Sequence, residues 1–218
     1  MPCCAASPGM AGRCRMADAA TQAKWDKLAP RFDTMASAGA EKRWAPDKSR
    51  LFSEMEGKVL FLALGTGLDI PFFPRGLSIT AIDISPKMIE LAQDRIAAYD
   101  GTIEAQVMDV HYMHFADDSF DMVVTSCTFC SVPRPVEGLK ALHRVLKPGG
   151  KLLMFEHTGS RWYPFRYMMN LMTLITRRIG PDMNRPTVAN VRAAGFRITE
   201  VCNVFLDVVK TIKAVKPA

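Results

Sequence analysis

Two glycines and an aspartate are spaced as in a site that holds a nucleotide. The glycine turn Gly65-Thr66-Gly67 follows an uninterrupted apolar run, 59–64, which is typical of a strand buried on both faces. Glycines around one small residue let the chain turn sharply and bring its N–H groups close to a ligand. A second predicted strand, 78–84, carries Asp83 near its end, where a carboxylate can accept hydrogen bonds from ribose hydroxyls. The pattern predicts a nucleotide-type site.

Three further side chains could take part in chemistry nearby. His157 directly follows the predicted fifth strand, where a neutral imidazole could accept a proton from an amine, thiol or hydroxyl. It could equally hold a loop through a backbone carbonyl. Cys127 and Cys130 have the CxxC spacing of a redox or metal pair, but the sequence offers no second such pair. We therefore interpret both cysteines as small pocket-lining residues and expect no metal site.

The elements that position these residues alternate between strand and helix. Turn residues divide the chain at most element boundaries, and the first helix is expected to be interrupted near Pro30. Trp44 and Pro46 are expected to mark a break before the second helix. The predicted helices cover 18–35, 46–55, 86–99, 135–146 and 187–194, and the predicted strands cover 59–64, 78–84, 102–107, 120–126 and 151–156. This alternation predicts a doubly wound α/β sheet.

The C-terminal end of the chain follows a different pattern. Two apolar runs, 196–206 and 208–215, read as strands that are separated only around Asp207. Strands joined so tightly cannot be parallel, because a parallel pair needs a long crossover connection. The sheet is therefore expected to be mixed, mostly parallel with an antiparallel last strand.

The composition is that of a soluble chain with one domain. Of 218 residues, 49% are hydrophobic and 23% charged, and the net charge of +6 suits anionic partners. No apolar run approaches the roughly 18–20 residues that span a bilayer. The spacing of the six cysteines favours reduced thiols and a cytoplasmic protein. Residues 1–17 do not resemble a signal peptide and are expected to be a disordered tail or an over-assigned start, followed by a single domain, 18–218.

Several segments together resemble the class I S-adenosylmethionine-dependent methyltransferases. The resemblance covers about 25–216 and depends on the GTG turn, AIDISPKMIELA, DSFDMVV and RVLKPGGKLLMFEH. It implies a Rossmann-like sheet of seven strands whose last strand is antiparallel. Within this class the chain resembles the ubiquinone/menaquinone C-methyltransferases and bacterial phospholipid N-methyltransferases. The run CTFCSVPRP through FEH also resembles the methyltransferase-like thiol S-methyltransferases.

The resemblance implies S-adenosylmethionine as cofactor and gives roles to individual residues. Asp83 would accept hydrogen bonds from both ribose hydroxyls, Ile84 and Met88 would flank the adenine ring, and Asp109 would face the adenine amine. The glycine turn would run beside the methionine part of the cofactor, and Ser126 would lie near the methyl group that is transferred. The full set of matching positions is Ala63, Gly65, Thr66, Gly67, Asp83, Ile84, Met88, Asp109, Val110, Ser126 and Cys127.

The chain departs from the family pattern at two places. Phe61 and Ala63 stand where the family usually carries an acid and a further glycine. Losing the acid removes a hydrogen-bond partner, and Ala63 crowds the closest approach of the cofactor. On the N-terminal helix, Phe32-Asp33 replaces the usual Tyr-Asp, so any role for a phenol hydroxyl is lost.

Two segments outside the predicted sheet are expected to close the pocket. Residues 18–55 form a helical cap from which Trp25 and Phe32 face the acceptor. Residues 158–187 form a lid over the acceptor, in which Arg161 and Arg166 meet a phosphate or an anionic membrane surface. The alternative for this second segment is a core-packed helix with solvated arginines.

Together these features predict transfer of a methyl group from S-adenosylmethionine to a small-molecule or lipid acceptor. A phospholipid headgroup amine is the first choice, and a small thiol or the carbon of a lipid quinone comes next. Two other classes stay open. An NAD-type oxidoreductase would share the glycine turn and Asp83, although Ile70 stands at the third glycine of its fingerprint. A non-catalytic nucleotide-binding protein would fit Phe61 and Ala63. A nucleic-acid substrate is not expected.

Overall fold

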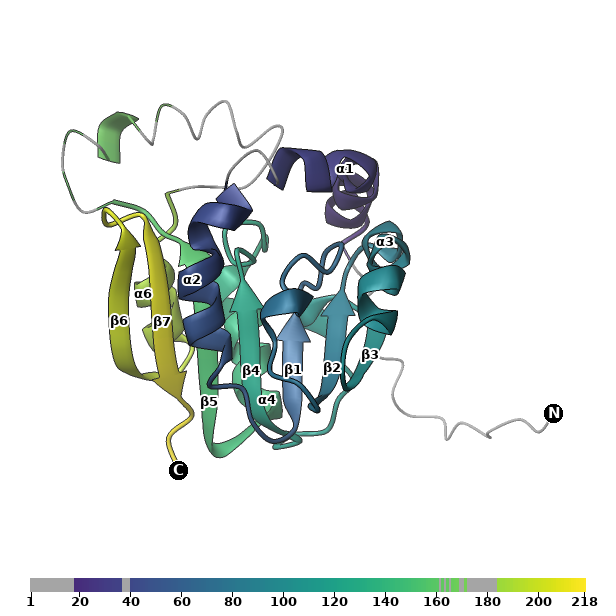
Figure 1. The fold of residues 1–218 in the computed structure, drawn as a ribbon. Coiled ribbons are helices and arrows are strands. Elements are labelled where there is room, and N and C mark those ends of the chain that lie inside the picture. Colours follow the sequence, from purple (N-terminus) through teal and green to yellow (C-terminus); the bar gives the residue numbers. More distant parts are fainter. Residues whose placement is uncertain are drawn as a thin grey trace, which may run out of the picture.

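A single mixed sheet organises the molecule. The computed structural model describes residues 18–36, 40–160, 162, 164, 166–168, 171 and 184–218. Seven strands lie in the order β3-β2-β1-β4-β5-β7-β6 (Figure 1). They are β1 (Val59–Leu62), β2 (Ser78–Asp83), β3 (Thr102–Val107), β4 (Phe120–Ser126), β5 (Leu146–His157), β6 (Arg197–Phe205) and β7 (Val209–Val215). Strands β1 to β5 pair in parallel, and β7 runs antiparallel between β5 and β6. The predicted fold class is confirmed.

Helices cover both faces of the sheet, because its central strands are apolar on both sides. On one face, α4 (Pro135–Val145) and α6 (Thr187–Ala193) pack over a core that includes Leu60 and Leu152. On the other face, α2 (Ala40–Phe52) and α3 (Pro86–Ala97) pack over Phe61 and Leu153. Two short 3₁₀ turns, η1 (Ile70–Phe72) and η2 (Val110–Tyr112), also belong to the described elements.

The first helix, α1 (Ala19–Ala36), runs through Pro30, so the predicted interruption is wrong. Contacts on either side of the proline tie both halves of the helix to α3. The Ser85 Oγ donates to Asp26 Oδ1 at 2.5 Å, and Arg95 Nη2 donates to Asp33 Oδ2 at 2.8 Å. These ties to the start and end of α3 compensate for the backbone hydrogen bond that a proline removes from a helix.

The predicted break at Trp44 and Pro46 is also wrong, because α2 begins at Ala40 and contains both residues. Tertiary packing fixes this part of the helix. The Trp44 ring lies 6.2 Å from the Phe155 ring and 5.7 Å from the Phe205 ring, measured between centroids. Two turns after Ala40, the buried Lys48 Nζ lies 2.7 Å from Asp69 Oδ1. Long-range contacts here outweigh the local preference of proline for a helix start.

Phe61, which stands in place of the family's acid, points into the apolar core beneath α2. Its side chain is fully buried, and its ring lies 4.8 Å from the Phe73 ring and 6.0 Å from the Phe52 ring between centroids. The substitution therefore adds an aromatic cluster to the core on that face. Within the described part of the chain, no helix combines the length and apolarity needed to cross a bilayer.

Candidate active site

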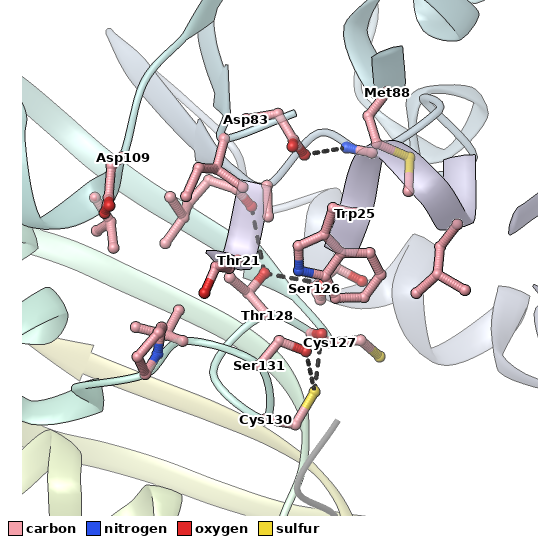
Figure 2. A pocket seen from close by; sticks show the side chains of 18 of the residues that line it. Thr21, Trp25, Asp83, Met88, Asp109, Ser126, Cys127, Thr128, Cys130 and Ser131 are labelled. Atoms are coloured by element: carbon pink, nitrogen blue, oxygen red, sulfur yellow. Dashed lines mark hydrogen bonds between the residues drawn. The ribbon is translucent and has the colours of Figure 1, made fainter. Parts of the chain in front are cut away.

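A cavity of about 430 Å³ opens at the carboxyl end of the parallel strands, beneath α1. Its volume falls in the range of roughly 300–1,000 Å³ that is usual for small-molecule sites. Figure 2 shows its wall, to which α1, the loops after β1, β2 and β4, and the end of β5 contribute. Of the residues predicted from the sequence, the wall includes Trp25, Phe32, Ala63, Gly65, Asp83, Ile84, Met88, Asp109, Val110, Ser126, Cys127 and His157.

The other predicted site residues lie elsewhere. Thr66 and Gly67 are buried behind the wall, where Thr66 Oγ1 donates to Asp33 Oδ1 at 2.5 Å. Gly67 has φ +83°, and a Cβ there would lie 2.9 Å from Ile70 Cδ1, so the position favours glycine for packing. Arg166 is exposed and is not part of the wall. Arg161 and much of the predicted 158–187 lid lie outside the described residues, as do residues 1–17.

Asp83 sits at the end of β2 with its carboxylate facing the glycine turn. Its Oδ2 accepts from Gly65 N at 2.8 Å, and its Oδ1 accepts from Ser85 N at 2.9 Å. Burial raises the pKa of this carboxyl, although the two backbone N–H groups work in the opposite direction. Gly65 has φ +58°, a conformation that glycine adopts without strain. The carboxylate and the turn therefore form one preformed unit in the wall.

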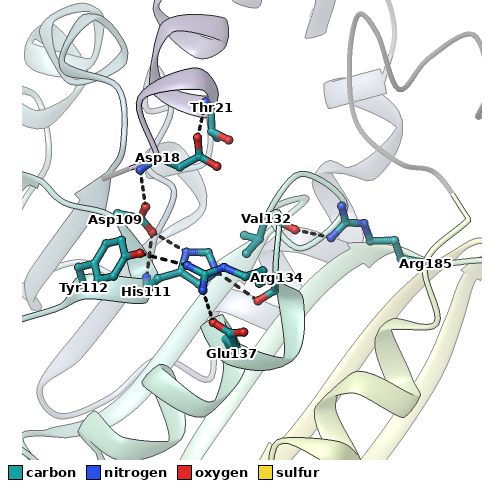
Figure 3. Close-up of polar contacts among 9 residues, drawn as sticks. All are labelled: Asp18, Thr21, Asp109, His111, Tyr112, Val132, Arg134, Glu137 and Arg185. Carbon is teal, nitrogen blue, oxygen red and sulfur yellow. Dashed lines mark hydrogen bonds and ion pairs between the residues drawn. The ribbon is translucent and has the colours of Figure 1, made fainter. Parts of the chain in front are cut away.

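Asp109 already has protein partners for both oxygens (Figure 3). Its Oδ1 accepts from His111 N at 2.9 Å and lies 2.7 Å from His111 Nδ1, while its Oδ2 accepts from Asp18 N at 3.1 Å. The pKa of Asp109 falls to about 2, because the hydrogen bonds from His111 and Asp18 outweigh the opposing effect of burial. Its hydrogen bonds thus fasten the start of α1 to the sheet.

The His111–Asp109 pair makes a pH-dependent contribution to stability. The hydrogen bond with Asp109 raises the pKa of His111, so the extra stability is fully present below about pH 6.5 and is lost as the pH rises through the folded pKa. We expect His111→Asn to cost about 1 kcal/mol more at pH 6 than at pH 9, measured by urea unfolding. His114→Asn, at an exposed histidine outside this pair, provides the control variant. Parallel pH curves for the two variants would contradict the prediction.

A buried glutamate, Glu156, shapes the wall from behind and was not singled out from the sequence. It is fully buried, and its Oε1 accepts from Thr125 Oγ1 at 2.9 Å and from Thr128 N at 3.1 Å. Its Oε2 accepts from Phe129 N at 3.1 Å. Burial raises the pKa of Glu156 to about 7. The available signal was an acid within the apolar run LLMFEH, where an unpartnered carboxylate would be costly.

The loop that Glu156 holds contains the two cysteines. Cys127 has φ +50°, which is uncommon for a residue with a Cβ, and its N–H donates to Phe155 O at 2.7 Å. Cys130 Sγ donates to Cys127 O at 3.1 Å. Burial raises the pKa of both thiols, that of Cys130 to about 12, so neither is an activated nucleophile.

His157 is a half-buried basic side chain in the wall at the end of β5. Burial lowers its pKa, and the positive charge of Lys48 lowers it further. The imidazole is therefore neutral at pH 7 and can accept a proton.

Comparison with known proteins agrees with this geometry. Residues 60–154 match the family model described as "Methyltransferase domain". The chain is 34% identical over 163 residues to the ubiquinone/menaquinone biosynthesis C-methyltransferase UbiE of Geotalea daltonii, an alignment that covers 70% of this chain and 69% of the relative. The chain belongs to the class I S-adenosylmethionine-dependent methyltransferases. It is an enzyme, and S-adenosylmethionine is its methyl donor.

Two further similarities concern different acceptors. This methyltransferase is 33% identical over 143 residues to the mouse thiol S-methyltransferase TMT1B, covering 60% of this chain and 58% of the relative. The fold also matches that of Haemonchus contortus phospholethanolamine N-methyltransferase 2, with a TM-score of 0.64 and 18% identity, over 91% of this chain and 61% of that one. At that identity the similarity concerns the fold alone.

The wall of the cavity suits the donor. An acidic residue beside a glycine turn matches a ribose, and the apolar side chains of Ile84 and Met88 match an adenine ring. Asp83 and Asp109 both already accept hydrogen bonds from the protein, Asp83 from Gly65 N and Ser85 N, and Asp109 from His111 and the start of α1. The predicted contacts of Asp83 with a ribose and of Asp109 with the adenine amine would therefore use remaining lone pairs of the two carboxylates.

Proposed function

We propose that this methyltransferase acts on a lipophilic acceptor that carries a weakly acidic group. The methyl group would go to an atom of that group or to an atom that the group activates, and a thiol is the first candidate. The proposal depends chiefly on His157, a neutral base in an otherwise largely apolar wall. The acceptor pocket would be formed by Trp25 and Phe32 from α1 together with the loop after β4. These surroundings favour an apolar acceptor over a charged one.

The chemistry divides between the donor and His157. When bound, S-adenosylmethionine supplies an electrophilic methyl group, and its sulfur keeps the electron pair of the broken S–C bond. His157 would accept the proton that leaves the thiol as the new S–C bond forms, and would pass that proton to solvent. The remaining wall residues align the acceptor, which is the larger part of catalysis for such a displacement.

A headgroup amine, the first choice from the sequence, is less well supported by the electrostatics. A headgroup amine is an ammonium ion at neutral pH, and an ammonium ion in a largely apolar cavity needs a carboxylate that is available to pair with it. Among the described residues, the carboxylates in the wall are Asp83 and Asp109, and both accept hydrogen bonds from the protein. The ring carbon of a lipid quinol, activated when its hydroxyl loses a proton, remains the second candidate, because the UbiE relative is named as a ubiquinone/menaquinone biosynthesis C-methyltransferase.

Initial rates with three acceptors test the proposal: a seven-carbon alkane thiol, a demethylated quinol, and phosphatidylethanolamine vesicles. We expect the thiol to be methylated, and His157→Gln to lower its kcat/KM at pH 7 by a factor of about 10² or more. An alkane thiol ionises by itself only well above pH 9, so the loss should shrink progressively as the pH rises above 9.

His143 provides the matched control, because burial lowers its pKa as well and it packs against Phe196 away from the cavity. His143→Gln should retain the wild-type pH profile. Turnover of phosphatidylethanolamine alone would overturn the proposal in favour of an amine acceptor. An unchanged rate for His157→Gln at pH 7 would remove the histidine from the mechanism.

A further inference from the structure

Exposed apolar side chains gather at one corner of the molecule. Nine large apolar side chains are exposed in the described part of the chain, and five of them belong to this corner. We define the apolar corner as Trp162, Tyr167, Met168, Leu171 and Leu206, whose exposed fractions are 76%, 64%, 49%, 66% and 60%. A concentration of this kind marks a surface that contacts something apolar.

Hydrogen bonds join the two segments that form the apolar corner. Ser160, itself buried, donates from Oγ to Asp207 Oδ1 at 2.7 Å, and its Oγ accepts from Trp162 N at 3.1 Å. Arg166 N donates to Trp162 O at 2.8 Å, as in a helical turn. The segment after β5 is thereby fixed beside the turn between β6 and β7, which carries Leu206. Figure 1 shows both at the carboxyl end of the sheet.

Basic side chains lie beside the corner, together with the acidic Asp207 that accepts from Ser160. In the sequence, residues 157–182 contain four arginines and one acidic residue, Asp182. Arg166 is exposed between the apolar residues of the corner. Arg43, at the start of α2, places its guanidinium carbon 4.0 Å from the centroid of the Phe205 ring, next to the same β6–β7 turn. Exposed Trp, Tyr, Leu and Met mixed with arginine is the composition of surfaces that lie at the headgroup level of a bilayer.

We propose that the apolar corner docks on the surface of an anionic lipid bilayer. Its aromatic and aliphatic side chains enter the boundary between headgroups and acyl chains, and the exposed Arg166 meets lipid phosphates. A protein partner would instead need well-packed pockets around buried anchors, whereas Trp162 and Leu171 project into solvent.

Docking would place the cavity beside the membrane. His157, in the cavity wall, is five residues before Trp162. Arg185 Nη1 donates to the carbonyl of Val132, another wall residue, and Arg185 O accepts from Gly159 N at 2.8 Å. The corner and the wall are therefore parts of one connected region. That an acceptor dissolved in the bilayer enters from this side depends on the proposed function, whereas the docking itself does not.

Vesicle flotation tests the docking with two compositions, phosphatidylcholine alone and phosphatidylcholine with about one third phosphatidylserine. We expect the wild type to float with the anionic vesicles and much less with the neutral ones. The double variant Trp162→Ala/Leu171→Ala should lose at least tenfold in partitioning. Arg166→Glu should lose binding to the anionic vesicles most strongly at low salt.

Matched controls come from exposed residues at the opposite edge of the sheet. Leu91→Ala/Val107→Ala removes apolar side chains of similar exposure, 46% and 52%, and Arg75→Glu reverses an exposed charge on another loop. Both should partition as the wild type does. Absence of wild-type flotation, or equal losses in the corner and control variants, would overturn the proposal. A change of oligomeric state confined to the corner variant would indicate a second copy of the chain as the occupant.

One readout separates this proposal from the acceptor assignment. Trp162→Ala/Leu171→Ala should bind S-adenosylhomocysteine normally and methylate a water-soluble thiol at the wild-type rate. If thiol methylation is absent in the wild type while flotation holds, the acceptor proposal fails and the docking stands.

Discussion

Asp83→Ala should weaken the binding of S-adenosylhomocysteine by one to three powers of ten, or roughly 2–4 kcal/mol. The substitution removes from the cavity wall the buried carboxylate that we expect to accept hydrogen bonds from two ribose hydroxyls. It also releases the Gly65 and Ser85 N–H groups that Asp83 now holds, so the glycine turn loses its support. Calorimetric titration of the wild type and the variant measures the loss directly.

Two matched variants help to separate the loss of the expected ribose contact from the loss of support for the glycine turn. Asp83→Asn keeps an acceptor for a backbone N–H but loses the charge and one acceptor oxygen, so it should fall between wild type and Asp83→Ala. Asp100→Ala makes the same truncation at a side chain that is 72% exposed and outside the cavity wall, and it should bind as the wild type does. Wild-type affinity in Asp83→Ala would contradict the assignment of the carboxylate to the ribose.

Glu156→Ala should lower the free energy of unfolding by about 3–5 kcal/mol. It leaves the Thr128 and Phe129 N–H groups and the Thr125 hydroxyl without their acceptor in the dry interior, and it opens a cavity. For a chain of this length the midpoint of thermal unfolding should fall by roughly 6–20 °C. Thr125→Val removes one donor only and should cost about 1 kcal/mol. Equal losses in these two variants would show that the backbone N–H groups find other acceptors.

The same glutamate predicts how stability depends on pH. The pKa of Glu156 is about 7 in the folded protein and 4.5 for an ordinary glutamate, so the folded state binds a proton that the unfolded state has released. Its contribution to stability therefore falls as the pH rises from about 4.5 to 7, by roughly 3 kcal/mol. Glu156→Gln cannot ionise and should lack this fall, whereas Glu104→Gln, on an exposed position of β3, should retain it. Parallel curves for wild type and Glu156→Gln between pH 5 and pH 8 would refute the prediction.

The sequence predicted the sheet and its mixed topology because those features follow from local patterns. Each apolar run, each glycine turn and the tight connection at Asp207 is a pattern of a few neighbouring residues. The antiparallel pairing of β6 with β7 follows from the shortness of the connection between them. Asp83 was found in the same way, since it occupies a fixed place at the end of a strand.

The features that were missed depend on partners far apart in the chain. Glu156 and Thr128 are 28 residues apart, and Arg95 and Asp33 are 62 apart, so no local pattern could pair them. The helix breaks predicted at Pro30 and Pro46 were wrong for the same reason. Each has the local preferences of a helix break, and contacts from α3, Asp69 and Phe205 keep the helix intact around it. Phe61 departs from the family pattern without changing the wall, because its side chain packs into the core beneath α2.

The position of α1 in the chain has a consequence for synthesis on the ribosome. The helix emerges before any surface on which it packs, since the partners of Asp33 follow 33 and 62 residues later. Until β1, β2 and α3 have been made, its apolar face with Trp25 and Phe32 has no core to cover. The last part of the cavity wall, His157, leaves later still. A nascent chain thus becomes able to hold its donor only after His157 has been translated, and it carries an exposed apolar helix until α3 has been made.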